Sequence, residues 1–307
     1  MLLRAPRHCD TPSTMTDDSH APWTVGKLIN WTRQYLVPAG IDQPRLAAEL
    51  LLAHVLRCRR IDLYTRFDYQ PTPEELTAFR KLIKRAALHE PVAYLTGRKE
   101  FYSMEFRVTA DVLIPRPETE ILVCEAISRL RAGGRESTTM WDICTGSGCV
   151  GIAVAANVPG VRVLATDISP QAVAVAAANA EAHGLGDRVR CRAADLLALP
   201  KDCRAMLPFN VIAANPPYVA DDDEVAATVE HEPPEALRAG KAGLDFLRPI
   251  IRDAGDFLNP GGAMLLEFGC GQADEVRNLI AETDAFAEPH IIRDHQGIER
   301  AAAATRR

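Results

Sequence analysis

The first third of the chain carries its hydrophobic residues at a helical spacing. Thr24 can cap a helix in which Val25 and Leu28 fall on one face. Thr72-Pro73-Glu74-Glu75 has the form of a capping box with proline at the first helical position. We therefore predict a bundle of four or five short helices over residues 22–97. We assign it as a substrate-docking domain, although no single residue marks a contact surface and its charged faces could simply be solvated.

The next stretch, residues 98–116, is predicted to be a bridge between two domains. Apolar and polar residues alternate loosely from Phe101 to Ile114, which favours a β-hairpin. Pro117 then precedes two glutamates, a combination that favours the start of a helix because acidic groups stabilise the positive end of the helix dipole. We therefore place the start of the last domain at residue 117.

From residue 140 onward, short apolar runs alternate with helical runs. This alternation is typical of a mostly parallel sheet that is covered by helices on both faces. A helix over residues 244–258 is expected to end at Asn259-Pro260-Gly261-Gly262, which contains three strong turn-forming residues. We predict an α/β, Rossmann-like domain over residues 117–307. Its seven strands are expected at residues 140–144, 161–166, 189–192, 209–214, 263–268, 290–293 and 300–304.

The composition narrows the possible partners. A length of 307 residues suits two domains, and a net charge of -6 argues against a protein that holds nucleic acid by neutralising phosphates. The eight cysteines include no C-x-x-C pair, which suits a reducing cytosol and gives neither a disulfide framework nor a zinc site. No apolar run approaches the ~18 residues of a membrane span. We expect a cytoplasmic monomer without bound metal, stable nucleic acid or membrane contact.

Residues 1–21 lack the apolar segment of a secretory signal. We predict a disordered leader, and the alternative is upstream sequence if translation starts at Met15.

Polar and glycine residues follow the strands predicted in the last domain. Gly146, Gly148 and Gly151 form a G-x-G-x-x-G, in which glycine lets a ligand or another backbone approach closely. Asp167 follows the second strand at a distance that suits the two hydroxyls of a ribose. Asp195 follows the third strand and could hold an adenine amino group or be an ordinary loop aspartate. The carboxyl ends of such strands share one crevice, so we expect these residues to converge.

Asn215-Pro216-Pro217-Tyr218 follows the fourth strand. The prolines stiffen the backbone and have no N–H, so this segment offers mainly carbonyl acceptors, to which Asn215 adds a carboxamide. Such a site could grip a planar group that carries an NH2. The alternative is a proline-rich turn that only ends a strand.

These motifs resemble the signatures of S-adenosylmethionine-dependent N-methyltransferases. The matching residues are Asp142-Ile143-Cys144-Thr145-Gly146-Ser147-Gly148, Asp167 and Asn215 to Tyr218. Residues 90–97, 100–102 and 115–120 are similar to the release factor glutamine methyltransferase family, PrmC/HemK, and Glu232-Pro233, Leu266-Glu267 and Gly269 also fit it. Two features depart from the family: Cys144 stands where many members have glycine, and Lys241-Ala242-Gly243 replaces a commoner Gly-x-Asp-Gly.

The resemblance implies methyl transfer to the glutamine nitrogen of a Gly-Gly-Gln segment in class-one peptide chain release factors. Asn215 and the Pro216 carbonyl would accept the two amide hydrogens, Tyr218 would pack on the amide face, and Pro217 would complete the substrate site. The cofactor would be S-adenosylmethionine, held by Cys144, Thr145, Gly146, Ser147, Gly148, Asp167, Asp195, Leu196 and Asn215. The alternatives are a ribosomal-protein glutamine methyltransferase, a DNA amino-methyltransferase, a dinucleotide-dependent dehydrogenase and a binding module without catalysis.

Overall fold

The computed structural model describes residues 22–132 and 138–307, and the leader predicted at residues 1–21 lies outside them. The chain divides into two compact units with a boundary between Thr96 and Gly97.

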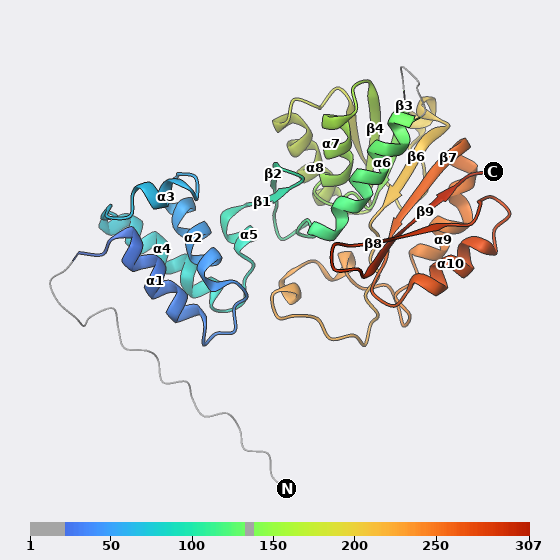
Figure 1. Ribbon diagram of the computed structural model, residues 1–307. Helices are drawn as coiled ribbons and strands as arrows, with labels where there is room; N and C mark the ends of the chain where they lie inside the picture. The colour runs from blue at the N-terminus through green and yellow to red at the C-terminus, as the bar shows by residue number, and fades with distance from the viewer. Residues whose placement is uncertain (1–21, 133–137) are drawn as a thin grey trace, which may run out of the picture. The chain divides into compact units, whose positions relative to one another are not determined.

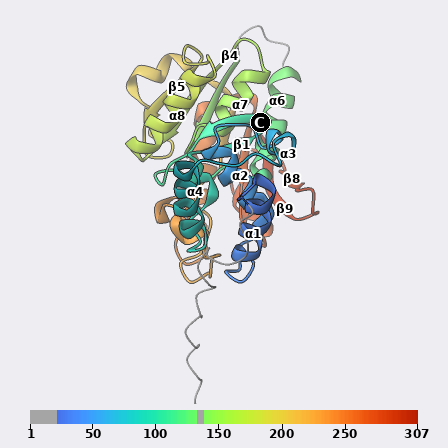
Figure 2. The ribbon, with the colours of Figure 1, turned by 90° about the vertical axis from the view of Figure 1, so that its left-hand side faces the viewer.

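The first unit is a bundle of short helices, as the hydrophobic spacing predicts (Figures 1 and 2). Its helices are α1 (Val25–Leu36), α2 (Pro44–Val55), α3 (Asp62–Thr65), α4 (Pro73–Ala86) and α5 (Val92–Thr96). Thr24 caps α1 by accepting from the backbone N–H of Lys27, and Thr72 and Glu75 form the complete capping box of α4. The core between the helices includes Leu28, Leu51 and Phe79, none of which is exposed.

The second unit contains the seven-stranded sheet, and the predicted α/β fold is confirmed (Figure 1). Its strand order is β5-β4-β3-β6-β7-β9-β8, with all neighbours parallel except β9, which is antiparallel to β7 and β8. The strands are β3 (Thr138–Ile143), β4 (Val161–Asp167), β5 (Val189–Ala193), β6 (Phe209–Ala214), β7 (Leu258–Glu267), β8 (His290–Arg293) and β9 (Glu299–Thr305).

Helices cover both faces of this sheet. One hydrophobic cluster joins the sheet to α6, α7 and α8, and the other joins it to α9 and α10. Successive side chains of a strand point to opposite faces of the sheet, so β3 contributes to both clusters. Met140 belongs to the first cluster and its neighbour Trp141 to the second. The helices are α6 (Glu120–Ala132), α7 (Cys149–Asn157), α8 (Pro170–Ala182), α9 (Leu247–Asp253) and α10 (Ala273–Ala281). Short 3-10 turns lie at η1 (Pro117–Thr119), η2 (Lys201–Met206), η3 (Val229–His231), η4 (Pro234–Ala236) and η5 (Ala254–Phe257).

The hairpin is shorter than its predicted extent. It pairs β1 (Arg98–Phe101) with β2 (Met104–Arg107) and turns at Tyr102 and Ser103, which both have positive φ. Residues 108–114 contain no strand, so the prediction that the hairpin runs to Ile114 is wrong. Val108, Val112 and Ile114 are nevertheless buried, which explains the alternation in the sequence.

The helix predicted over residues 244–258 is also shorter than expected. Its α-helical part, α9, ends at Asp253 and continues as the 3-10 turn η5. Asn259-Pro260-Gly261-Gly262 lies inside β7, where the register with β6 shifts. An irregularity of this kind accommodates a proline and two glycines within a strand.

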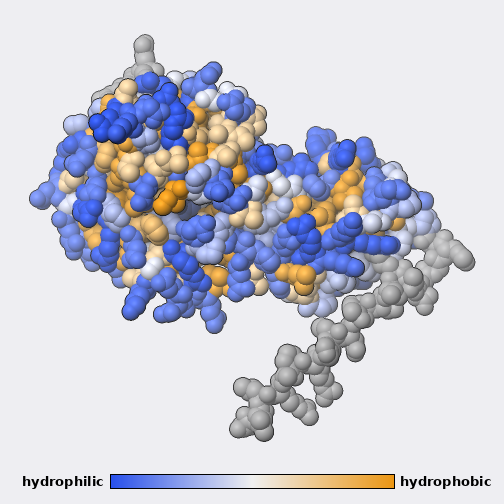
Figure 3. Space-filling view, turned by 180° about the vertical axis from the view of Figure 1, so that it is seen from behind, coloured by the Kyte–Doolittle hydropathy of each residue, from blue (hydrophilic) through white to orange (hydrophobic). Residues whose placement is uncertain are grey.

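Among residues 22–132 and 138–307, no helix has the length and hydrophobicity needed to cross a bilayer. On the face seen in Figure 3, hydrophobic residues lie in small areas between hydrophilic ones.

Candidate active site

The side chain of Asp142 holds the glycine loop between β3 and α7 through hydrogen bonds. This buried carboxylate accepts from the Thr145 hydroxyl at 2.6 Å and from the Gly151 backbone N–H at 3.0 Å. A Cβ at residue 151 would lie 3.0 Å from Asp142 Oδ2, so the third glycine of the motif is needed for close approach. Burial raises the pKa of Asp142 to about 6. The carboxylate therefore fixes the shape of the loop rather than facing solvent.

Backbone conformation within this loop explains its other glycines. Gly146 and Gly148 have φ of 53° and 82°, in the left-handed region that glycine adopts without a Cβ penalty. Cys144, where many relatives are expected to have glycine, has φ of 56°. It therefore carries a side chain in a backbone conformation that disfavours one.

Asp167 joins this loop to the end of β4. Its Oδ2 accepts from the Gly146 N–H at 2.9 Å and its Oδ1 from the Ser169 N–H at 3.0 Å. Burial raises the pKa of Asp167, and the two backbone donors oppose that rise. The carboxylate thus lies at the carboxyl end of a parallel strand with fixed orientation, where ligands of such sheets bind.

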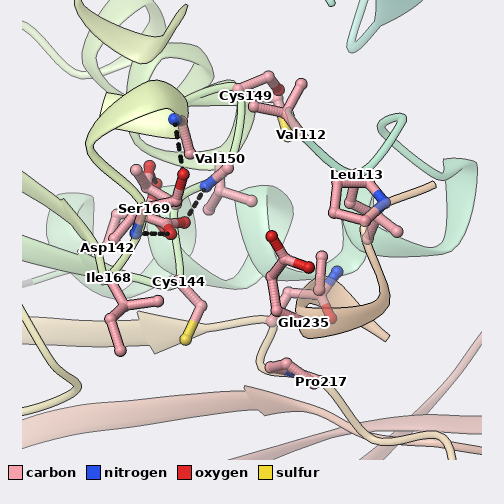
Figure 4. Close-up of a pocket in the computed structure, with 18 of the residues that line it drawn as sticks. Val112, Leu113, Asp142, Cys144, Cys149, Val150, Ile168, Ser169, Pro217 and Glu235 are labelled. Atoms are coloured by element: carbon pink, nitrogen blue, oxygen red, sulfur yellow. Dashed lines mark hydrogen bonds between the residues drawn. The ribbon is translucent and has the colours of Figure 1, made fainter. Parts of the chain in front are cut away.

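A single cavity gathers most of the residues that the sequence singles out. Figure 4 shows Cys144, Ile168 and Ser169 on one side and Val112 and Leu113 on the other, with Pro217 below and the Glu235 carboxyl group pointing into the space between the two sides. The predicted cofactor residues that line the cavity are Cys144, Thr145, Gly146, Ser147, Asp167, Asp195, Leu196 and Asn215, and Pro217 of the predicted substrate site joins them.

Three predicted residues are not among the described residues that line this cavity: Gly148, Pro216 and Tyr218. Gly148 is the first residue before α7, where a Cβ would lie 3.1 Å from the Cβ of Ala176. It therefore allows α7 and α8 to pack closely. Pro216 and Tyr218 flank the lining residue Pro217 along the chain.

The segment after β6 is held by hydrogen bonds at both ends. The Asn215 Nδ2 donates to Thr119 Oγ1 at 3.1 Å, and the Tyr218 hydroxyl donates to Glu267 Oε1 at 3.3 Å. The Gln272 Nε2 donates to the Tyr218 backbone carbonyl at 3.1 Å. Burial raises the pKa of Tyr218, so its hydroxyl stays protonated and remains a donor.

Sequence reasoning missed several lining residues, and Thr119 and Glu235 are the two that bring polar groups to the site. Thr119 belongs to the segment in which the sequence predicts a helix start, and its buried hydroxyl accepts a hydrogen bond from Asn215, 96 positions away. Glu235 lies in the irregular stretch between β6 and α9, and the sequence offers no signal that it faces the cavity. The same stretch is anchored by Glu232, which is paired with Arg116 and accepts from the Ile114 N–H at 3.0 Å.

The lining suits a nucleoside that carries a charged, polar end. The Ser147 hydroxyl is buried without a hydrogen-bond partner among the described residues, so a ligand group could satisfy it. Asp167 offers a carboxylate for hydroxyl donors, while Val112, Leu113, Ile168 and Phe246 supply apolar surface. The residues present therefore fit S-adenosylmethionine.

Comparison with known proteins gives the class and then the family. The fold is similar to that of the hMettl16 catalytic domain solved with MAT2A 3′UTR hairpin 6, with 17% sequence identity, coverage of 71% of this chain and 80% of that chain, and a TM-score of 0.52. Residues 119–240 match the methyltransferase small domain, and residues 27–97 match the PrmC N-terminal domain. Fold and site thus define an S-adenosylmethionine-dependent methyltransferase, and S-adenosylmethionine is its cofactor.

Two curated relatives identify the family. The release factor glutamine methyltransferase of Rhodopirellula baltica is 42% identical over 285 residues, which are 91% of this chain and 95% of the relative. Its counterpart from Geobacter sulfurreducens is 40% identical over 281 residues, again 91% and 95% of the two chains. The chain belongs to the release factor glutamine methyltransferase family, as its motifs suggest.

Proposed function

We propose that this protein methylates the side-chain nitrogen of the glutamine in the Gly-Gly-Gln segment of class-one peptide chain release factors. The names of its relatives support the release factor as substrate. The scattered cysteines support the cytoplasm as the place of action. The names of the relatives favour the release factor over the ribosomal-protein and DNA alternatives.

The observation that carries the proposal is the orientation of Asn215. Its carboxamide lies at the carboxyl end of β6, lines the cavity with the glycine loop, and directs its NH2 to Thr119. Its oxygen is therefore the atom available to an incoming NH2 group. The Pro216 carbonyl is the second acceptor, because the following residue, Pro217, has no N–H that would compete for the substrate.

The cofactor would be held by the residues of the glycine loop and the two strand ends beside it. Cys144, Thr145, Gly146, Ser147 and Gly148 belong to the loop, and Asp167, Asp195 and Leu196 to the strand ends. Bound there, S-adenosylmethionine supplies an electrophilic methyl group. Asp167 would accept from ribose hydroxyls, and the loop would receive the amino acid end of the cofactor.

The task of the protein is to align a weak nucleophile. The nitrogen of an amide is unreactive because its lone pair is delocalised into the carbonyl group. Two acceptors on its hydrogens fix the NH2 plane and raise the electron density on nitrogen, and Tyr218 restricts access of water from one side. Orientation of this kind lowers a barrier by about 7–11 kcal/mol at its best. No strong base is needed, because the nitrogen loses a proton readily once methylated.

We assign the two units different tasks. The helical domain, residues 22–97, docks the release factor; the hairpin bridge, residues 98–116, leads into the methyltransferase domain, residues 117–307. The protein acts as a monomer without bound metal.

A transfer assay tests the proposal. Purified protein is mixed with S-adenosylmethionine carrying a labelled methyl group and with unmodified release factor, and label on the release factor is counted. We expect transfer by the wild type, its loss in Asn215→Ala, and wild-type rates in Asn278→Ala, an exposed asparagine on α10. Cofactor binding by Asn215→Ala should remain measurable by calorimetry. Equal transfer by all three proteins would refute the role of Asn215.

A further inference from the structure

Three polar side chains from distant parts of the sequence meet beside the cavity. Asn215 follows β6, and Glu267 ends β7. The parallel register pairs Ala214 with Leu266, so these two residues are the next ones along neighbouring strands. Thr119, at the end of η1, is the third member. Thr119 and Glu267 are each only 2% exposed, so water has little access to either side chain.

The hydrogen-bonding capacities of these groups fix the direction of each bond. An ionised carboxylate only accepts, and a threonine hydroxyl has one hydrogen to donate. The Tyr218 hydroxyl donates to Glu267 Oε1 at 3.3 Å, while Glu267 Oε2 is buried without a hydrogen-bond partner among the described residues and is open to the Thr119 hydroxyl, which lowers the pKa of Glu267 against the effect of burial. Once the hydrogen of Thr119 points to Glu267, its oxygen can only accept from Asn215. The structure shows that bond, from Asn215 Nδ2, at 3.1 Å.

We propose that Thr119 and Glu267 are positioning residues that determine which end of the Asn215 carboxamide faces the substrate. This inference rests on the proposed function. With the NH2 group of Asn215 held by Thr119, its oxygen meets the substrate amide as an acceptor. A carboxamide turned over would present NH2 to NH2, two donors that cannot bond. The buried carboxylate of Glu267 thus determines which end of the Asn215 carboxamide faces the substrate, without itself contacting the substrate.

The protonation state of Glu267 should control this orientation of the Asn215 carboxamide. Burial raises the pKa of Glu267 to about 7, and Glu118 on η1 adds to the rise. Opposing it are the hydroxyls of Thr119 and Tyr218, which favour the ionised carboxylate, and the charge of Arg300 on β9. Below that pH the carboxyl group carries a hydrogen and can donate to Thr119. Thr119 is then free to donate to Asn215, and the preferred orientation of the carboxamide is lost.

Threonine variants separate this role from simple packing. Thr119→Val keeps the shape and removes the hydroxyl, and Thr119→Ser keeps the hydroxyl. Thr139→Val is the matched control, because Thr139 is a buried threonine at the amino end of β3 whose hydroxyl donates to the Pro208 carbonyl at 3.2 Å. For each variant, kcat and KM are measured with unmodified release factor, and the Kd for S-adenosylmethionine by calorimetry.

We expect Thr119→Val to lower kcat on the order of 100-fold, as a misplaced group can. Its KM and cofactor Kd should stay within about twofold, because alignment rather than binding is lost. Thr119→Ser should recover most of the rate, and Thr139→Val should match the wild type. A wild-type kcat in Thr119→Val would overturn the inference. An equal loss of kcat and cofactor binding in both Thr119 variants would also overturn it, since that pattern indicates packing.

A pH profile supplies an independent test should Thr119→Val fail to fold. The wild-type kcat should fall as the pH drops through about 7, and Glu267→Gln, which does not titrate, should lack that step. An unchanged step in Glu267→Gln would refute the inference. If the wild type transfers no methyl group to release factor, the proposed function fails and the inference with it. If the wild type is active and the variants behave like it, only the inference fails.

Discussion

Asn179 on α8 joins the hairpin to the glycine loop. Its Nδ2 donates to the Ser147 carbonyl at 2.8 Å and to the Arg107 carbonyl at 3.0 Å, and its Oδ1 accepts from the Arg107 N–H at 2.8 Å. The side chain is 2% exposed, so these three bonds have no competition from water. One carboxamide thus ties the strand β2 to the loop that lines the cavity.

We predict that Asn179→Ala destabilises the second unit by about 3 kcal/mol, because it leaves several buried backbone groups unpaired. It should also weaken S-adenosylmethionine binding, since the loop at Ser147 loses its support. Urea unfolding and calorimetry measure the two effects. The exposed control Asn278→Ala should change neither, and unaltered stability in Asn179→Ala would show that the link is dispensable.

Glu49 is a buried polar residue with several hydrogen bonds in the helical unit, as Asn179 is in the second unit. It is 2% exposed and accepts from Arg45 at 2.9 Å, from Arg60 at 3.0 Å and from the Tyr64 hydroxyl at 2.7 Å. Burial alone would raise the pKa of Glu49, but the hydrogen bonds from Tyr64, Arg45 and Arg60 outweigh it and lower the pKa below its ordinary value. The carboxylate therefore favours the folded state when it is ionised.

Because the pKa of Glu49 is lower in the folded state, the stabilisation that this residue provides must decrease as the pH falls. The stabilisation from Glu49 is present above the pKa of an unfolded glutamate and is lost as the pH falls through the lower value of the folded state. We predict that Glu49→Gln lowers the melting temperature of the helical unit at pH 7 and that the difference from wild type shrinks toward pH 3. Calorimetric scans over this range measure it. A difference independent of pH would contradict the electrostatic origin.

The pair of Arg116 and Glu232 anchors the irregular stretch that carries Glu235 into the cavity. Glu232 is 3% exposed, whereas the Arg116 side chain is about one-third exposed. We predict that Arg116→Ala costs about 2 kcal/mol, because it leaves a buried carboxylate without its cation, with a discount for the exposure of Arg116. Residues 219–243 should then be cut faster by protease in the native protein. The double variant Arg116→Ala/Glu232→Gln should regain part of the resistance, and equal cleavage of all three proteins would exclude an anchoring role.

The strand ends of the site could be predicted from sequence because each is encoded locally. The glycines around residue 146 and the carboxylate of Asp167 follow apolar runs directly, and the register of a parallel sheet brings such ends to one edge. The helix caps at Thr24 and Thr72 are similarly local. These features need only neighbouring residues for their geometry.

The features that were missed depend on contacts between distant residues. The hairpin turns at Tyr102 and Ser103, which carry no glycine or asparagine signal, and the Tyr102 N–H is held by Glu120 Oε1 at 2.8 Å. Pro260 lies within a strand because β7 departs from regular register with β6 there. Thr119 gains its proposed role only from Asn215, which follows β6, and Glu267 at the end of β7. Sequence spacing alone contains none of this information.

The central claim is that the nitrogen of one glutamine receives the methyl group. It is tested most directly by incubating the protein with isotopically labelled S-adenosylmethionine and unmodified release factor, then locating the label by peptide mass spectrometry. We predict label on the glutamine of the Gly-Gly-Gln segment and nowhere else. Label on a different residue, or a release factor that remains unlabelled while ribosomal protein or DNA is modified, would contradict the account.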